Sequence, residues 1–293
     1  MKTTIIGLGL IGGSIALDLR RSGLATDLVG IDLNPLNASR AVELGLVDKI
    51  ESEAIAISSA DLVVLAIPVN ALSQLLPSVL DAIKKKAVVI DTGSTKRMIC
   101  RAIDHHPNRG QFVASHPIAG TENSGPDAAF EGLFRGKTNI ICEMEKSSKE
   151  ALMLANRVFT VLGLNTIFME PEEHDKHVAY VSHLSHVSAF LLGQTVLDIE
   201  RDEKNIFALA GSGFASTVRL AKSSPDMWAP IFEQNAEFLS QALLEYIMHL
   251  QRFQYSLMKR DGKELRRIMK DANRIREILN GIEYKQVKQI QEK

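Results

Sequence analysis

The sequence is poor in cysteine, balanced in charge and free of long apolar runs. Its only two cysteines, Cys100 and Cys142, lack the spacing of a metal site, and so few thiols favour a reducing compartment. The formal net charge of −1 excludes a dedicated nucleic-acid surface. No uninterrupted apolar run reaches the ~20 residues that a membrane-spanning helix needs. Because the first predicted strand begins almost at the N-terminus, we expect no signal peptide. These features predict a cytoplasmic protein that binds neither nucleic acid nor membrane.

The composition is that of a soluble globular protein. Hydrophobic residues make up 45% of the chain and charged residues 24%. A length of 293 residues is sufficient for two domains and a sizeable core.

A glycine-rich turn between an apolar strand and a helix is the most informative motif. The β-branched run 3–6 leads into Gly7-Leu8-Gly9-Leu10-Ile11-Gly12, and an apolar helical pattern follows to position 19. Gly7 permits a tight turn, Gly9 lets the backbone approach a pyrophosphate, and Gly12 lets helix and strand pack closely. The phosphates would lie at the unpaired N–H groups of the helix N-terminus. The motif predicts a dinucleotide site formed by Gly7, Gly9, Leu10, Ile11 and Gly12, and an ordinary strand-to-helix turn is the alternative.

Asp32 predicts which dinucleotide is bound. It lies 20 positions after Gly12, at the end of the apolar run 28–31. A carboxylate at this place accepts hydrogen bonds from a ribose 2′-OH and repels a 2′-phosphate. The next residues, 33–35, include no arginine that could hold such a phosphate. NAD is therefore favoured over NADP, and Asp32 could also cap a helix that begins near Pro35.

Short apolar runs alternate with helical patterns through the first 170 residues. This alternation is typical of a parallel α/β sheet, and together with the glycine motif it predicts a Rossmann-type doubly wound fold. We expect strands at 3–6, 28–32, 62–67, 88–91, 112–115, 138–142 and 166–169, and helices at 69–83 and 149–162. The strand ends would face one crevice, where Ile67, Pro68, Ser94 and His116 could converge on a bound nicotinamide.

Strand patterns stop after Pro171, and helical patterns continue from there. We therefore expect an NAD-binding domain over residues 1–170 and an all-helical substrate and dimerisation domain over residues 171–293. Proline followed by acidic residues predicts that a helix begins at Pro171. The segment 178–199 is apolar almost all round, which is typical of a helix buried on every side.

Such a buried helix commonly completes its core against a second copy, so we expect a homodimer. Further long helices are expected near 226–250 and 263–279, and the polar end 284–293 is expected to fray.

Four histidines, at positions 174, 177, 183 and 186, lie close together in the sequence. At about 100° per residue, the first two would point to the opposite side of one helix from the last two. They would then be unable to share a metal ion, and we expect no metal site. His174 and His177 are expected to be solvated. His183 and His186 form a polar patch on a buried helix that must meet partners or a ligand, and a satisfied core pair is the alternative.

His116 is the candidate general base, because it follows a strand at the crevice where ligands bind. Ser94 could hydrogen-bond one imidazole nitrogen and fix its tautomer, which leaves the other nitrogen to face a substrate. Ser94 could equally be the N-cap of a helix after Thr95. Arg219 has a planar fork that suits a carboxylate if it reaches the crevice, and surface ion pairing is the alternative.

Together these motifs resemble those of the prephenate and arogenate dehydrogenases of tyrosine biosynthesis, over nearly the whole chain. The matching segments are residues 7–14, 91–96, 115–125 and 182–186, and Arg219 followed by 224–228. The resemblance implies that His116 is the catalytic histidine and Ser94 its hydrogen-bonding partner. It also implies that the substrate cleft contains Glu122, Ser182, His183 and His186, with Arg219 as the carboxylate-binding arginine.

The chain departs from the family pattern at two places. Many relatives carry an acid three residues before the arginine, where this chain has Ser216, and this change bears on how Arg219 is anchored. Many also have proline between the paired histidines, where this chain has Ser185.

The resemblance implies the oxidative decarboxylation of prephenate to 4-hydroxyphenylpyruvate with reduction of NAD. His116 would take the C4 hydroxyl proton as a hydride leaves C4 for NAD⁺, and the ring carboxylate would leave as CO₂. An arogenate dehydrogenase that forms tyrosine directly is the alternative, and Glu122 is a candidate for favouring its amino group. A β-hydroxyacid dehydrogenase would need a lysine motif that the helical half lacks. A non-catalytic NAD(H)-sensing protein would need neither His116 nor Arg219.

Overall fold

The computed structural model describes residues 1–203 and 205–281. Contacts between residues divide the chain into two compact units, Met1–Ala236 and Glu237–Lys293. In the described part of the chain, no helix has the length and apolar character needed to cross a membrane.

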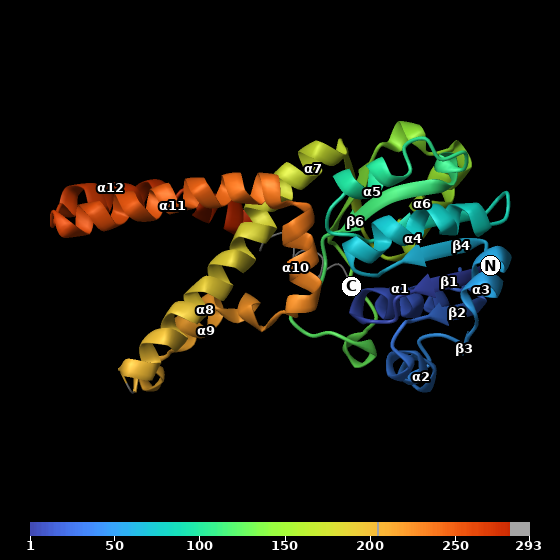
Figure 1. Ribbon diagram of the computed structural model, residues 1–293, viewed down its shortest axis with the longest axis horizontal. Coiled ribbons are helices and arrows are strands. Elements are labelled where there is room, and N and C mark those ends of the chain that lie inside the picture. The colour runs from blue at the N-terminus through green and yellow to red at the C-terminus, as the bar shows by residue number, and fades with distance from the viewer. Residues whose placement is uncertain (204, 282–293) are drawn as a thin grey trace. The chain divides into compact units, whose positions relative to one another are not determined.

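An eight-stranded sheet forms the centre of the first unit (Figure 1). The strand order is β3-β2-β1-β4-β5-β6-β7-β8. The strands are β1 (Lys2–Ile6), β2 (Asp27–Ile31), β3 (Lys49–Ile50), β4 (Leu62–Leu65), β5 (Val88–Asp91), β6 (Phe112–Pro117), β7 (Thr138–Cys142) and β8 (Asn165–Met169). The chain moves outward in one direction from β1 to β3 and in the other from β4 to β8. This reversal beside β1 creates the crevice at the carboxyl ends of the strands in which dinucleotides bind.

Strands β1 to β6 pair in parallel, but β7 runs antiparallel to β6 and parallel to β8. At this side the sheet departs from the parallel pairing that the alternating pattern indicates. Parallel neighbours require a crossover connection, usually a helix. The connection between β6 and β7 contains only the short 3₁₀ helix η2 (Pro126–Ala128), so the chain returns in the opposite direction. The predicted Rossmann-type fold with a helical second part is otherwise confirmed.

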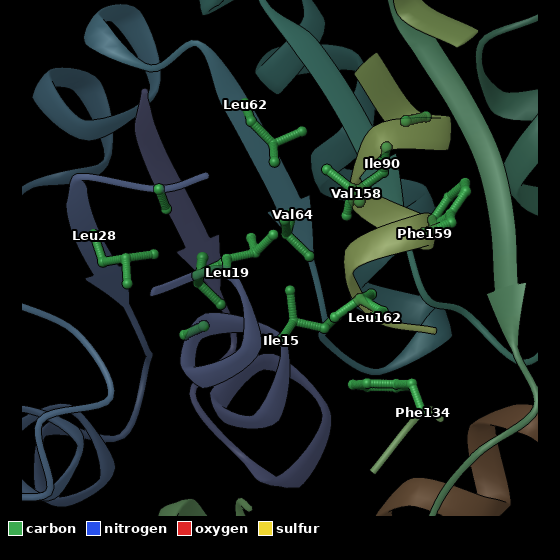
Figure 2. Packing of buried hydrophobic residues seen from close by; sticks show 14 of the residues in the cluster. Ile15, Leu19, Leu28, Leu62, Val64, Ile90, Phe134, Val158, Phe159 and Leu162 are labelled. Atoms are coloured by element: carbon green, nitrogen blue, oxygen red, sulfur yellow. The ribbon is translucent and has the colours of Figure 1, made fainter. Parts of the chain in front are cut away.

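Helices cover both faces of the sheet. They are α1 (Leu10–Arg21), α2 (Pro35–Glu43), α3 (Glu53–Ser59), α4 (Val69–Ala82), α5 (Arg97–Ala102) and α6 (Lys149–Val161). On one face, Ile15 of α1 and Val158 of α6 belong to the same core cluster as Val64 and Ile90 of the central strands (Figure 2). On the other face, α4 and α5 pack on the alternate residues of the same strands, such as Leu65. Strands buried on both faces fix the crevice rigidly between β1, β4, β5 and β6.

A long helical stretch follows β8. It consists of α7 (Pro171–Val178), a π-helical turn η4 (Ala179–His183) and α8 (Leu184–Asp202). The 3₁₀ helix η5 (Ile206–Leu209), α9 (Ser212–Thr217), the 3₁₀ helix η6 (Arg219–Lys222) and α10 (Pro225–Gln234) complete the first unit. Trp228 and Ile231 of α10 join the core cluster formed by α4 and α5.

Burial of α8 differs from the sequence-based expectation. Leu191 is 54% exposed and Leu197 is 53% exposed. In a single chain, therefore, this helix is not buried on every side. The apolar side chains that led to the expectation lie on its surface.

The second unit contains α11 (Ala236–Met258), which starts at the last residue of the first unit, and α12 (Gly262–Ala272). The Asp261 side chain caps α12 by accepting hydrogen bonds from the N–H groups of Lys263 and Glu264. Arg252 of α11 forms an ion pair with Glu264 of α12 at 2.7 Å. The single helix predicted near 226–250 is two helices that separate at Asn235, and the predicted fraying at 284–293 lies outside the described residues.

Candidate active site

The glycine-rich turn connects β1 to α1 and has the geometry of a phosphate-binding turn. Gly7 has φ +94°, and a Cβ added there would lie 2.3 Å from the Ala66 carbonyl oxygen. A Cβ on Gly12 would lie 1.9 Å from the Gly7 carbonyl oxygen. A Cβ on Gly9, by contrast, would approach only the Gly125 nitrogen, at 3.9 Å. Gly7 and Gly12 are therefore needed for packing, whereas Gly9 keeps space open in front of the α1 N-terminus.

The first helical residues of α1 are Leu10 and Ile11, and no side chain caps this helix. Its leading N–H groups are thus available to an anion. Ile67 and Pro68 lie between β4 and α4, and a Cβ on Gly7 would meet the Ile67 Cγ2 atom at 2.9 Å. Both residues therefore lie beside the glycine-rich turn, at the mouth of the crevice.

Asp32 follows β2 directly and is half-buried. Its carboxylate accepts hydrogen bonds from the N–H groups of Leu8 and Asn34, each at 2.9 Å. The cap of α2 is Asn34, whose side chain accepts from the N–H of Leu36. The capping role considered for Asp32 thus belongs to Asn34. Asp32 is held against the glycine-rich turn, where its carboxylate fits the ribose of a dinucleotide.

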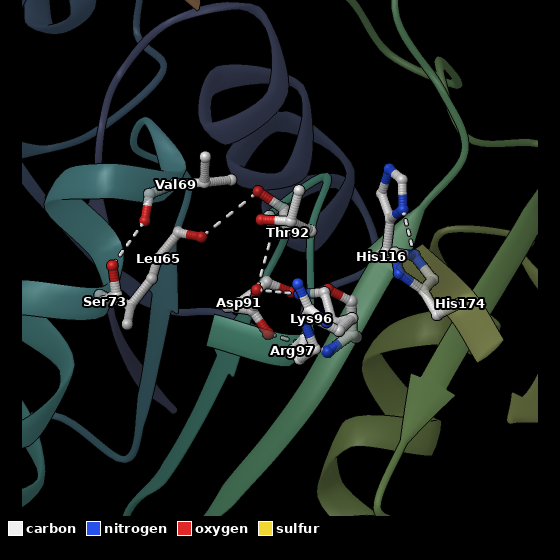
Figure 3. A network of polar contacts seen from close by, with 12 residues as sticks. Leu65, Val69, Ser73, Asp91, Thr92, Lys96, Arg97, His116 and His174 are labelled. Atoms are coloured by element: carbon white, nitrogen blue, oxygen red, sulfur yellow. Dashed lines mark hydrogen bonds and ion pairs between the residues drawn. The ribbon is translucent and has the colours of Figure 1, made fainter. Parts of the chain in front are cut away.

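His116 lies on β6 and is 8% exposed. Its Nδ1 atom is 2.8 Å from Nε2 of His174, and the two rings meet edge to face at a centroid distance of 5.0 Å. His174 and Asp175 are both fully buried on α7, and Nδ1 of His174 is 2.7 Å from Oδ1 of Asp175. Figure 3 shows the His116 and His174 rings facing each other. The three side chains form a continuous line of hydrogen bonds.

The expectation that His174 is solvated is wrong, because its ring is fully buried beside His116. His174 is the hydrogen-bonding partner of His116 Nδ1. The predicted contact between Ser94 and one nitrogen of His116 stays a prediction. Ser94 is half-buried in the loop between β5 and α5, and it does not cap α5, whose N-cap is Lys96. The carboxylate of Asp175 accepts hydrogen bonds from the leading N–H groups of α5 instead.

The π-helical turn changes the direction of the histidines relative to one another. A regular helix would place His174 and His183 on opposite sides. The wider turn at 179–183 breaks that periodicity, and both His174 and His183 lie close enough to His116 to lower its pKa. The helical period used in the prediction therefore does not hold across this turn. His177, in contrast, is exposed as expected. In the described residues, no group of three or more His, Cys, Asp or Glu side chains is placed to hold a metal ion.

A buried ion pair supports the floor of the crevice. Lys96 and Asp91 are both fully buried, and the ammonium group of Lys96 contacts the Asp91 carboxylate (Figure 3). The ammonium group also donates to the carbonyl oxygen of Ser115 at 2.7 Å, and Asp91 accepts from the Ser115 N–H at 2.9 Å. These contacts tie the end of β5 to β6 one residue before His116.

Burial determines the protonation of His116. It lowers the pKa of this imidazole well below its ordinary value, and the charges of His174 and Lys96 add to the effect. Burial likewise lowers the pKa of His174, against the opposing influence of Asp175. The two rings are therefore neutral at neutral pH, as a general base must be before it accepts a proton.

His183 and His186 lie beside Trp228 of α10. The His183 ring is 1% exposed, and its Nδ1 atom is 3.0 Å from the Asn235 side-chain nitrogen. Burial lowers the pKa of His183 to about 4. His186 stacks on Trp228 at a centroid distance of 3.6 Å and donates from Nδ1 to the Ser182 carbonyl oxygen at 3.0 Å. Both histidines thus have protein partners, and His183 also lies close enough to His116 to influence its pKa.

Arg219 is on η6, and its side chain is 52% exposed. It pairs with Glu122, which lies in the loop after β6, at 3.1 Å. Burial lowers the pKa of His186, and the charge of Arg219 contributes to this shift. The structure therefore brings together Arg219, Glu122 and His186 from three distant segments. This places a cation at the helical edge of the site.

Sequence reasoning missed Lys96, Asp175 and Asn235. Asn235 is fully buried, and its side-chain nitrogen donates to the Asp175 carbonyl oxygen at 2.8 Å. Lys96 lies within the matching segment 91–96, and its position five residues after Asp91 was the feature of the sequence that could have indicated the ion pair. For Asp175 and Asn235 the sequence offered no signal, because their contacts join segments that are far apart along the chain.

Comparison with known proteins places this arrangement in one family. The family model "Prephenate dehydrogenase, nucleotide-binding domain" matches residues 15–167, and "Prephenate dehydrogenase, dimerization domain" matches residues 170–271. Prephenate dehydrogenase of Bacillus subtilis is 32% identical over 94% of this chain and 76% of its own length. Cyclohexadienyl dehydrogenase of Zymomonas mobilis is also 32% identical, over 93% of this chain and 94% of its own.

Among solved structures, prephenate dehydrogenase from A. aeolicus, in complex with hydroxyphenyl propionate and NAD⁺, superposes with a TM-score of 0.86. It is 33% identical, and the match covers 95% of this chain and 98% of that one. The glycine-rich turn, the buried histidine on β6 and these matches over almost the full length agree with one another. The chain therefore belongs to the prephenate dehydrogenase family of NAD-dependent oxidoreductases.

Proposed function

We propose that this protein oxidises prephenate to 4-hydroxyphenylpyruvate and CO₂ with reduction of NAD⁺. The observation that carries the proposal is the buried, neutral His116 at the end of β6, in the crevice that also contains the glycine-rich turn. An NAD(H)-sensing protein would have no use for a base at this position.

The chain's own residues would hold NAD⁺ at two points. The pyrophosphate fits the space in front of Gly9 at the α1 N-terminus, and the adenosine ribose fits the carboxylate of Asp32. Ile67 and Pro68 would face the nicotinamide end. Bound NAD⁺ supplies the acceptor for the hydride that leaves C4 of the substrate. A 2′-phosphate would meet the negative charge of Asp32, so NAD is preferred over NADP.

His116 takes the proton of the C4 hydroxyl as that carbon is oxidised. The bond between the ring and its carboxylate then breaks, CO₂ leaves, and the electron pair completes the aromatic ring. The resulting phenolate oxygen recovers the proton from His116. Each turnover thus returns the imidazole to its neutral state.

Arg219 would hold one of the two substrate carboxylates. In the free protein its guanidinium pairs with Glu122, so a carboxylate must compete with Glu122 for it. Ser182 and His183 are in η4 and His186 is in the first turn of α8, from which His183 or His186 would assist the second carboxylate. Ser94 stays a candidate for a contact with the substrate or His116.

Arogenate differs from prephenate in carrying an amino group where prephenate has a keto group. Glu122 is the residue that would favour arogenate as the substrate. If the Glu122 carboxylate leaves Arg219, it could pair with the ammonium group of arogenate. The two substrates are therefore expected to compete at one site.

We also propose a homodimer, formed through the helical part of each chain. The matching family model is described as a dimerisation domain, and α8 presents exposed leucines such as Leu191 and Leu197. The division into domains at 170/171 and the cytoplasmic location are proposed on the sequence pattern.

A direct assay tests the function. The absorbance of NADH is followed with each of prephenate and arogenate, and with each of NAD⁺ and NADP⁺. The expected result is turnover with prephenate and NAD⁺, with 4-hydroxyphenylpyruvate as the product. No reduction of either cofactor with either substrate would refute the proposal. Turnover with arogenate alone would show that arogenate, and not prephenate, is the substrate.

A further inference from the structure

We propose that His174 and Asp175 are positioning residues for His116: they keep its proton on Nδ1 and leave Nε2 free to accept the substrate proton. This inference rests on the proposed function for its catalytic meaning. The arrangement of protons itself can be tested without a substrate.

The direction of the hydrogen bonds follows from what each group can donate. The Asp175 carboxylate accepts from the backbone N–H groups of Lys96 and Arg97 at 2.7 and 3.0 Å, so it serves as an acceptor on both oxygens. Nδ1 of His174, 2.7 Å from the same carboxylate, must therefore carry the proton. A neutral His174 then has its lone pair on Nε2.

That lone pair faces His116. Nε2 of His174 is 2.8 Å from Nδ1 of His116, so Nδ1 of His116 is the donor. The remaining nitrogen of His116, Nε2, consequently has no proton. In Figure 3 this second nitrogen points away from His174. Asp175, which is connected to His116 through two hydrogen bonds, thus determines that Nε2 of His116 is the atom that accepts a proton.

Asp175 is held on every side, which makes the selection rigid. Besides the two N–H groups of α5, the Asn235 side chain donates to the Asp175 backbone carbonyl at 2.8 Å. Asp175, His174 and Asn235 are all fully buried. Since none of these groups needs to reorganise during turnover, the base is oriented in advance.

The groups around His116 keep it neutral in the free protein. Lys96, paired with Asp91, faces it from the end of β5, His174 and Asp175 from α7, and His183 from the π-helical turn. Burial and the charges of His174, Lys96 and His183 all lower the pKa of His116. The imidazole is therefore unprotonated before the substrate arrives, and its tautomer decides which nitrogen can act as the base.

A pair of substitutions separates positioning from packing. His174→Phe keeps an aromatic ring beside His116 but removes the acceptor for its Nδ1–H. His174→Gln keeps a carbonyl oxygen that can accept this hydrogen bond. We expect the Phe variant to bind NAD⁺ normally and to lose about 10²-fold in kcat with little change in KM, because a misplaced proton disables the base.

The Gln variant is expected to retain at least tenfold more kcat than the Phe variant, and the acidic limb of its kcat profile should shift less from that of the unmodified protein. A purely structural role predicts the reverse order, since Phe fills the apolar volume better. Equal kcat values in both variants, or a Phe variant within twofold of the unmodified protein, would overturn the inference.

Nitrogen NMR of histidine rings in the unmodified protein keeps the test independent of activity and of variant folding. The His116 signals are identified by their loss in His116→Asn. At neutral pH without substrate, we expect a neutral ring protonated on Nδ1. A neutral ring protonated on Nε2 would refute the proposed role of His174 and Asp175. If the ring is protonated on Nδ1 but the protein oxidises neither prephenate nor arogenate, the proposed function is refuted and the role of His174 and Asp175 in placing the proton is kept.

Discussion

Replacing His116 by asparagine removes the base from the site while keeping a small polar side chain there. We expect His116→Asn to lose about 10²–10⁴-fold in kcat, the range contributed by a positioned general base. NAD⁺ affinity should stay unchanged, because the glycine-rich turn and Asp32 are separate from this side chain. Steady-state NADH formation and calorimetric titration with NAD⁺ measure the two quantities. Turnover close to that of the unmodified protein would remove His116 from the mechanism.

Replacing Arg219 should affect substrate binding far more than stability. In the free protein its pair with Glu122 is exposed to solvent and contributes little to stability, so Arg219→Ala should leave the unfolding midpoint almost unchanged. A charge-assisted hydrogen bond to a substrate carboxylate is worth about 1.5–3 kcal/mol. We therefore expect KM to rise about 10- to 100-fold without a change in NAD⁺ affinity.

The neighbouring Lys222→Ala removes a cation from the same 3₁₀ helix and serves as the control, with an unchanged KM expected. An unchanged KM in Arg219→Ala as well would show that the substrate binds elsewhere.

At the scale of elements, different glycines of the glycine-rich turn serve packing and cofactor binding. A Cβ on Gly12 would overlap the Gly7 carbonyl, so Gly12→Ala must displace α1 from β1, with an expected loss of about 3 kcal/mol in unfolding free energy. A Cβ on Gly9 meets nothing closer than 3.9 Å, so Gly9→Ala should fold normally. It should nevertheless bind NAD⁺ more weakly, because the methyl group occupies the space for the pyrophosphate. Urea unfolding and NAD⁺ titration of both variants check this. A Gly9→Ala protein with normal NAD⁺ affinity would place the pyrophosphate elsewhere.

The helical stretch from α7 to α8 should make the protein sensitive to acid. Burial depresses the folded-state pKa of His174 and of His183, the latter to about 4, against an ordinary value near 6.5. As the pH falls, these imidazoles take up protons more readily in the unfolded chain than in the folded protein. Proton binding therefore stabilises the unfolded state and lowers the free energy of unfolding. Stability should thus be constant above about pH 6.5 and fall as the pH drops from there toward 4.

Urea midpoints at a series of pH values measure this slope. His183→Gln should reduce it, and His177→Gln, at an exposed position, should leave it unchanged. A flat profile between pH 7 and 5 would show that the buried imidazoles do not control stability.

The same elements show how far the sequence could be interpreted. Seven predicted strands match observed ones within about two residues at either end, because apolar runs and the glycine-rich turn are local signals. The two-residue β3 was too short to produce such a signal. The direction of β7 depended on a connection without a helix, and the orientation of His174 depended on a π-helical turn. Neither is encoded in a regular period of 2 or 3.6 residues.

At the site, motif residues such as His116 and Arg219 were visible in the sequence, but their partners were not. His174, Asp175 and Asn235 act through contacts that form only when α7 and α10 pack on the sheet. Ser94 is a predicted partner of His116 because it lies within a motif, whereas the observed partner of His116 Nδ1, His174, lies 58 positions away in the sequence. Local patterns thus located the reacting group, while the residues that orient it required the fold.

At the scale of the whole molecule, the exposed apolar face of α8 predicts how the chain associates. The sequence pattern of residues 178–199 is that of a buried helix, yet Leu191, Leu197 and Ile199 are about half exposed in a single chain. A second copy that covers this face would account for the pattern. We expect sedimentation equilibrium to give twice the 32.3 kDa mass of one chain. Leu197→Glu should shift the equilibrium toward the monomer, because a carboxylate would have to lose its hydration at the interface. Met153→Glu replaces an apolar side chain of similar exposure on α6 and should leave the dimer intact. A monomer in the unmodified protein, or equal behaviour of the two variants, would exclude α8 as the surface of association.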